Sequence, residues 1–425
     1  MREEKEIFSF SRSMLFQCAL LFVGICAGLW INGYCLVLVA GITIFTAIFT
    51  KPKNVYYQLL FCLPFTMIYK LSPSSTSLFA YVMLAVGVIL IFKIRSFGIL
   101  QLLLILLFTI YIVIGMGNNA TTVIKMVIGL ILFYIFTKKI KPRDFKNQVF
   151  AFTLGMLGSS CIGLLKGSWH RLDMYYSDMN TIYIDGIESQ RFTGLYLDPN
   201  YYSVSVIFAL TLCALMFFNK VANRGVLGFA TLSLTIFGFL SYSKIFLLAV
   251  AIEIVVFFFW GLKPTRKKFI SLIFILLGVF ILYQWMQEGD YLAIMADRLL
   301  IGDISTGRFY IWENYLNYIW SSPKTFILGD GLGAAYRVVG GPHNTFIESV
   351  FFLGIVGSAI LFVTIISIFK NRQLSDRKNV LLYILPVVFC VMASTLGCLT
   401  VNDLMFYCMM MWMSLNFSAV REWRY

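Results

Sequence analysis

Charge is scarce in this chain of 425 residues. Charged side chains make up 13% of the sequence, whereas 60% of the residues are hydrophobic. The mean hydropathy of +0.84 is far above that of a soluble domain. This shortage of charge excludes a soluble globular protein and indicates an integral membrane protein.

Cysteine is missing from the long polar segments of the chain. Each of the nine cysteines falls inside or at the edge of a hydrophobic run, so no disulfide framework is indicated. The N-terminal segment lacks the small-residue cleavage pattern of a secretory signal, which predicts that the first hydrophobic run is retained as a helix. We find no internal repeat and no soluble domain.

Hydrophobic runs fill most of the remaining sequence. A bilayer-spanning helix needs about 20 apolar residues, and the pattern predicts about 14 such helices, with a range of about 12–14. We therefore expect an all-α polytopic protein with a single membrane domain over residues 1–425. The expected spans are 14–30, 34–50, 55–70, 77–93, 97–115, 120–137, 148–166, 200–218, 225–240, 245–260, 269–286, 346–369, 379–397 and 403–418.

Basic residues gather in alternate connections between these spans. Lys51, Lys53, the run 138–143 and the tail residues Arg421 and Arg424 all fall on one side if the spans alternate. Short basic loops stay in the cytoplasm, so both termini are expected there. The net charge of +14 is then explained by topology and requires no nucleic-acid partner.

Two long connections, residues 167–199 and 287–345, face outward in this topology. Within the first, the alternation around Asp185-Gly186 predicts a hairpin over 181–190. Within the second, Ser305 and Thr306 precede aromatic residues at helical spacing. This pattern predicts an interfacial helix near 306–320 that is capped by one of those hydroxyls.

A glycine-rich link at residues 328–333 follows this predicted helix. Its backbone amides are expected to approach a ligand.

Histidine occurs only twice, as His170 and His343, and both fall in the outward connections. An imidazole titrates near neutral pH and suits proton transfer. His343 stands in Pro-His-Asn at the entrance to a helix, which favours a role for it, whereas a lone outward histidine is otherwise a solvated residue. Arg191 and Arg308 offer planar donor forks that match phosphate oxygens, although arginines at an interface also anchor headgroups.

The order of short motifs in the second half carries a family resemblance. The motifs are Arg191-Phe-Thr-Gly194 with Asp198-Pro199-Asn200, Ser243-Lys244, Gly307-Arg308 with Trp312, Pro323, the alternating glycines at 329, 331 and 333, and His343-Asn344. From about residue 190 to 360, this set resembles the O-antigen ligase/polysaccharide polymerase superfamily. Lys244 stands where many members carry arginine.

The resemblance implies a fold related to the lipid-dependent (GT-C-like) glycosyltransferases. It also implies a metal-independent enzyme without a cofactor, in the bacterial cytoplasmic (inner) membrane, with its active site on the outer face. The donor would be an oligosaccharide on undecaprenyl diphosphate, and a flippase and a chain-length regulator would be partners in capsule or lipopolysaccharide synthesis. We favour a polymerase; a ligase of the same family is the alternative.

The residue types fit this chemistry. Arg191 and Arg308 are expected to stabilise the diphosphate leaving group, and His343 to deprotonate the acceptor hydroxyl. Further residues are expected to bind the substrate, with helix capping and interface anchoring as the competing roles: Lys244, Asp198, Asn200, Trp312 and Asn344.

A transporter of lipid-linked oligosaccharides is the alternative from another class. A transporter places polar residues along a route through the membrane. Lys125 and Glu253 are the clear charges inside the predicted spans. They could pair, or Glu253 could line a cavity, but two charges make a thin route, so the enzyme is favoured.

Overall fold

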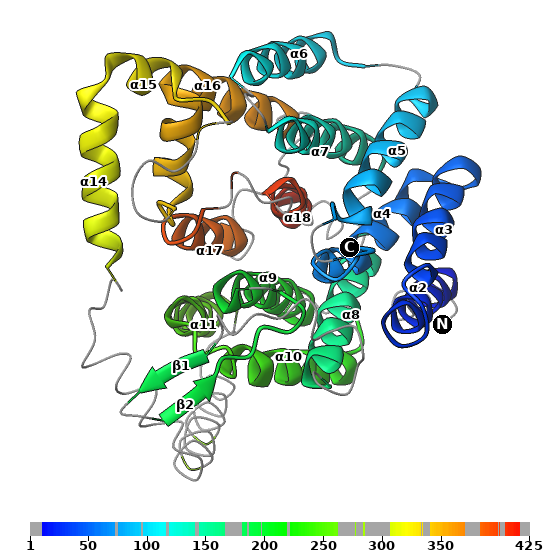
Figure 1. Cartoon of the computed structure of the whole chain (residues 1–425). Coiled ribbons are helices and arrows are strands. Elements are labelled where there is room, and N and C mark those ends of the chain that lie inside the picture. The colour runs from blue at the N-terminus through cyan, green and yellow to red at the C-terminus, as the bar shows by residue number, and fades with distance from the viewer. Residues whose placement is uncertain are drawn as a thin grey trace.

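The computed structural model describes most of the hydrophobic sequence as helix (Figure 1). The described residues are 11–72, 75–94, 97–115, 119–140, 144–165, 181–184, 187–196, 198–218, 222–261, 277, 284, 307–332, 334, 341–369, 383–397, 399 and 404–416.

The first part of the chain forms a series of helices separated by short stretches of sequence. They are α2 (Arg12–Trp30), α3 (Cys35–Phe49), α4 (Pro52–Cys62) with the 3-10 turn η1 (Leu63–Phe65), α5 (Leu78–Lys93), α6 (Ile99–Ile114), α7 (Ala120–Lys139) and α8 (Phe145–Leu164).

The second part contains a hairpin and the remaining helices. These elements are β1 (Thr181–Ile184), β2 (Ile187–Gln190), α9 (Pro199–Phe218), α10 (Arg224–Phe239), α11 (Lys244–Val256) with the π-helical turn η4 (Phe257–Gly261), α14 (Arg308–Ser321), α15 (Pro323–Leu328), α16 (Thr345–Phe369), α17 (Ile384–Ala393) and α18 (Leu404–Asn416).

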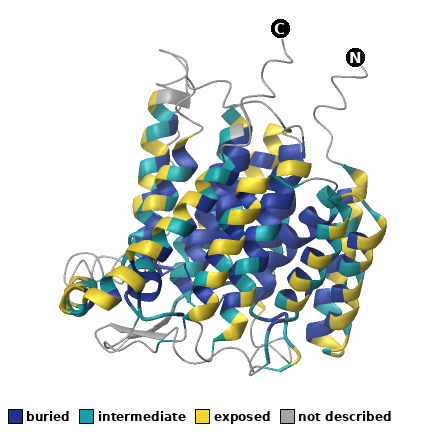
Figure 2. Ribbon diagram, turned by 90° about the horizontal axis from the view of Figure 1, so that it is seen from above, coloured by how far each residue is buried: buried dark blue, intermediate teal, exposed yellow. Residues whose placement is uncertain are grey.

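Helix α9 forms the centre of the bundle. In the most apolar window of α9, 78% of the residues are buried, against 33% in α2. Figure 2 shows the same gradient, with buried residues in the middle and exposed ones on the outer helices. An exposed apolar surface of this extent is what a bilayer covers, and α2, α7, α9 and α16 are each long and apolar enough to cross one.

Most predicted spans agree closely with observed helices. The prediction 200–218 corresponds to α9, and 120–137 corresponds to α7. Within the described residues, six shorter apolar helices accompany the four long ones, so the multi-pass helical character is confirmed. The span 269–286 lies outside the described residues except for positions 277 and 284, and the number of about 14 spans stays a prediction.

Two predicted spans end early. The span 55–70 is wrong in its second half, because α4 stops at Cys62 and continues only as the turn η1, which contains Pro64. A proline supplies no amide hydrogen to a continuing α-helix. The span 379–397 likewise ends at Ala393, and the chain then turns.

The predicted hairpin is confirmed. Strands β1 and β2 pair antiparallel, with Ile184 opposite Ile187.

The helix predicted near 306–320 corresponds to α14, at the edge of the molecule beside α15 (Figure 1), and its interfacial position stays a prediction. Its predicted cap is not observed: Gly307, with φ of 78°, occupies the N-cap position and provides no side-chain hydrogen bond. Ser305 and Thr306 lie outside the described residues.

Candidate functional site

The glycine-rich link after α15 packs into a break in α16. Gly354 has φ of 61° and ψ of −177° inside this helix, so the carbonyls before it lack their usual helical partners. The amide of Asp330 donates to the Phe351 carbonyl at 2.8 Å, and the amide of Gly331 donates to the Phe352 carbonyl at 2.9 Å. These two amides serve the fold, so the expectation that they approach a ligand is wrong.

Asn344 fixes the start of α16. Its Oδ1 accepts from the amides of Phe346 (3.0 Å) and Ile347 (3.1 Å), and its Nδ2 donates to the Ser394 carbonyl at 3.0 Å. Both ends of the amide group are therefore used within the protein, which favours the capping role over sugar binding.

His343 directly precedes this cap and has an unusual backbone. Its φ is 45°, in the left-handed region that non-glycine residues seldom occupy. Pro342, just before it, accepts a hydrogen bond on its carbonyl from Trp312 Nε1 at 2.8 Å. The histidine thus sits between two residues that are both held by side-chain hydrogen bonds.

Arg191 is oriented by two acceptors from separate elements. Its Nε donates to the Ser241 carbonyl at 3.0 Å, and its NH2 group donates to Asn200 Oδ1 at 3.2 Å. Ser243 Oγ donates to the same amide oxygen at 3.2 Å, and Asp198 Oδ1 accepts from the Asn200 amide at 2.6 Å. The start of α9 and the turn before α11 together hold this guanidinium.

Lys244 follows Ser243 as the first residue of α11 and is half-buried. Its place in the chain brings a second basic residue to the turn that holds Arg191.

Arg308, His343 and Asp198 interact electrostatically. Burial lowers the pKa of the His343 imidazole below its ordinary value, the Arg308 charge lowers it further, and the Asp198 carboxylate opposes both. Burial also lowers the pKa of Arg308, while Asp198 and Tyr201 raise it. Asp198 directly precedes α9, Arg308 begins α14 and His343 lies at the entrance to α16. Electrostatic interactions therefore connect three separate parts of the sequence.

Sequence reasoning missed the segment after α17. Here the Ser394 carbonyl accepts from Asn344, and the Gly397 carbonyl accepts from the Tyr201 hydroxyl at 2.6 Å. Glu348, only 1% exposed, accepts a hydrogen bond on Oε2 from the Leu399 amide at 3.0 Å. A carboxylate in the first turn of an apolar helix was the available signal for Glu348.

The remaining candidates lie elsewhere. His170 lies outside the described residues. Glu253, which the sequence offered as a partner for Lys125, accepts a hydrogen bond from the Thr211 hydroxyl. No group of three or more His, Cys, Asp or Glu side chains placed to hold a metal ion occurs among the described residues.

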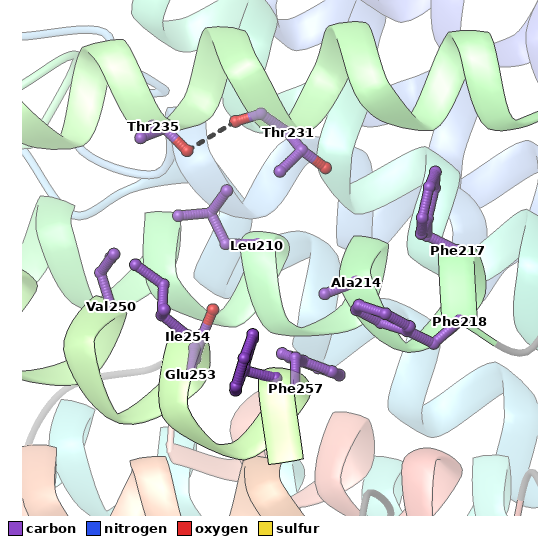
Figure 3. Close-up of a pocket in the computed structure, with 11 residues that line it drawn as sticks. Leu210, Ala214, Phe217, Phe218, Thr231, Thr235, Val250, Glu253, Ile254 and Phe257 are labelled. Atoms are coloured by element: carbon purple, nitrogen blue, oxygen red, sulfur yellow. Dashed lines mark hydrogen bonds between the residues drawn. The ribbon is translucent and has the colours of Figure 1, made fainter. Parts of the chain in front are cut away.

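Glu253 also reaches into a cavity of about 350 Å³ between α9, α10 and α11 (Figure 3). Glu253 is the one charged residue among those that line it, and the other lining residues are aliphatic, aromatic or threonine. Such an apolar lining does not resemble the polar route that a transporter of glycans requires.

The comparisons with known proteins agree with the motif order. Residues 227–362 match the family model described as O-Antigen ligase. This segment includes Lys244, Arg308, Trp312 and His343, whereas Arg191 and Asp198 precede it. No curated protein and no solved structure gives a significant match. The predicted resemblance to the O-antigen ligase/polysaccharide polymerase superfamily is therefore confirmed over residues 227–362 of this multi-pass helical chain.

Proposed function

We propose that the protein is a membrane glycosyltransferase that moves a glycan from undecaprenyl diphosphate to a sugar hydroxyl of a lipid-linked repeat unit. The observation that carries this proposal is the electrostatic influence of Arg308 and Asp198 on the pKa of His343, since the three residues come from distant parts of the sequence. Arg191, held by Asn200 and Ser241, adds a second guanidinium at the start of α9. The family match supports the same class of reaction.

The arginines act on the leaving group. As the bond between the anomeric carbon and the diphosphate breaks, its electron pair and the negative charge move to the phosphate oxygen. Fixed guanidinium groups stabilise that charge without having to reorganise, and their planar fork matches two oxygens at once. The existing hydrogen bonds of Arg191 supply the fixed orientation that such stabilisation needs.

His343 acts on the acceptor. The acceptor oxygen attacks the anomeric carbon while the imidazole takes the hydroxyl proton. Since burial and Arg308 both lower the pKa of His343, the neutral form that can accept a proton predominates at neutral pH. One direct displacement inverts the anomeric centre.

Several finer points belong to this proposal. The bilayer and the lipid-linked oligosaccharide are the partners, and the site faces the outside of the bacterial cytoplasmic membrane. A ligase that uses the same donor but a lipid A core as acceptor is the second candidate, because the matched family model bears that description.

The decisive experiment supplies the purified protein with a lipid-linked repeat unit and separates the products on a gel. A ladder supports the polymerase, and product on lipid A core alone supports the ligase. His343→Ala should reduce turnover by about 10²–10⁴-fold while substrate binding persists. A chelator should leave the wild-type ladder unchanged. Turnover close to wild type in His343→Ala would remove this residue as the base.

Arg308→Lys tests the role of the guanidinium. The substitution keeps the positive charge, but an ammonium group cannot form the paired hydrogen bonds of the fork. We expect kcat to fall by about 10²-fold, in the range seen when one donor to a transition-state oxyanion is lost. Lys324→Arg, at an exposed position on α15, is the control. Unchanged kcat in Arg308→Lys would identify Arg308 as an interface anchor.

A further inference from the structure

Trp312 links the helix that carries Arg308 to the turn that carries His343. We propose that Trp312 is a positioning residue whose hydrogen bond to the Pro342 carbonyl sets the spacing between these two groups. The inference rests on the proposed function, because it assumes that both groups act on one substrate. It replaces the predicted role of Trp312 in sugar binding.

The geometry of the link is simple. Trp312 lies four residues after Arg308 in α14, so both side chains occupy the same face, one turn apart. Its Nε1 donates at 2.8 Å to Pro342, which immediately precedes His343. A tryptophan has a single ring donor, and this donor is already occupied within the protein.

The other half of α14 is attached by different contacts. Tyr315 is fully buried and meets the Phe351 ring edge-on, with centroids 5.2 Å apart. The Tyr318 hydroxyl donates to Asp330 Oδ2 at 2.8 Å. These contacts hold the C-terminal half of α14 to α16 and the glycine link. Trp312 supplies the corresponding bond for the half that begins with Arg308.

The backbone of His343 explains why such a bond matters. A non-glycine residue at φ of 45° has a less stable backbone than in the right-handed region, and it persists only where its surroundings hold it. Trp312 holds the residue before His343, and Asn344 bonds to Ser394 on the other side. Without the Trp312 bond, the turn is free to relax and carry the imidazole away from Arg308.

Trp312→Phe removes the ring N–H and keeps an aromatic side chain. We expect kcat to fall about tenfold, as for loss of one hydrogen bond that orients a reacting group, with KM for the lipid-linked substrate little changed. Trp320→Phe is the matched control, because Trp320 is an exposed tryptophan on the same helix that stacks on Phe326. If Trp312→Phe does not accumulate, benzothienylalanine at position 312 keeps the two fused rings and lacks the N–H.

The pH profile separates positioning from simple stability. The charged groups that act on His343 in the described structure are Arg308 and Asp198. Greater separation from Arg308 weakens the influence that lowers the pKa of His343, so the acidic limb of kcat/KM should move to higher pH in Trp312→Phe. Trp320→Phe should leave the limb in place.

Three outcomes would overturn the inference or its basis. Wild-type kcat and an unmoved limb in Trp312→Phe would overturn the positioning role while leaving the proposed function intact, provided that His343→Ala is inactive. A rise in KM alone would assign Trp312 to substrate binding. Full activity in His343→Ala would instead overturn the proposed function itself.

Discussion

Asp198 acts on both ionisable groups of the candidate site. Its carboxylate raises the pKa of His343 against the lowering by burial and Arg308, and it also raises the pKa of Arg308. In the proposed reaction the imidazole becomes a cation when it accepts the proton, and a nearby carboxylate stabilises that cation. At the scale of single residues, Asp198 therefore has one role in the proposed reaction. It stabilises the imidazolium that forms when the neutral His343 imidazole accepts the proton.

Asp198→Asn isolates the charge of this residue. The amide retains an oxygen that can accept from the Asn200 amide, as Asp198 Oδ1 does. Loss of the negative charge removes the influence that raises the pKa of His343. The imidazole then stays neutral to lower pH, and the acidic limb of kcat/KM should move to lower pH.

Glu313→Gln is the control for that shift, because Glu313 is exposed on α14. An acidic limb that stayed in place or moved upward in Asp198→Asn would contradict the arrangement of Asp198, Arg308 and His343.

At the scale of elements, the break in α16 locks the glycine link to the bundle. The single Tyr111 hydroxyl of α6 lies within hydrogen-bond distance of the carbonyls of Leu328 (2.8 Å) and Leu353 (2.7 Å), on either side of the contact. A carbonyl freed by a helix break needs a new partner inside a membrane protein, and the link and Tyr111 provide partners. The break thereby fixes α15, and α14 through it, relative to α16.

Gly354→Ala should destabilise the protein by about 1–3 kcal/mol, because its backbone angles belong to a region that only glycine occupies readily. A methyl group there would lie 2.4 Å from the Ile327 carbonyl oxygen and 2.5 Å from the Gly329 nitrogen. The measurement is the midpoint of thermal unfolding in detergent. Gly228→Ala, with no atom within 4 Å of the added carbon, should not lower it.

An unchanged midpoint in Gly354→Ala would mean that α16 does not depend on the break.

At the scale of the whole molecule, hydrogen bonds between buried side chains hold α9 among its neighbours. The hydroxyls of Ser160 on α8 and Tyr202 lie 2.7 Å apart, and those of Ser205 and Tyr407 on α18 lie 2.9 Å apart. Polar pairs of this kind connect helices where the surrounding lipid is as apolar as the side chains. Because Asp198 directly precedes α9 and Asn200 lies in its first turn, this packing positions one side of the candidate site.

Cysteine labelling tests the expected orientation of the molecule. In a cysteine-free background, Lys324→Cys on α15 should react with an impermeant maleimide in spheroplasts, whereas Lys51→Cys should react only after permeabilisation. Both positions are exposed, and basic residues such as Lys51 favour the cytoplasmic side. The opposite pattern would place the site in the cytosol and contradict an enzyme that faces outward.

The sequence by itself determined where helices form, because the length of an apolar run and the charge that ends it are local properties. The close agreement of α7 and α9 with their predictions follows from this, and so does the hairpin at residues 181–190. The motif order also sufficed to predict the resemblance to this family, which the match over residues 227–362 confirms.

The tertiary structure alone decided which helix ends meet. Apolar runs of similar composition do not encode their neighbours, so no local pattern predicted that Ser241 accepts from Arg191 or that Trp312 bonds to Pro342. For the same reason the use of the glycine-link amides by α16 emerged only from packing, whereas Pro64 was a local signal for the early end of α4. A bilayer favours helices because their backbone hydrogen bonds are satisfied internally. The polar contacts between helices determine the arrangement of the site.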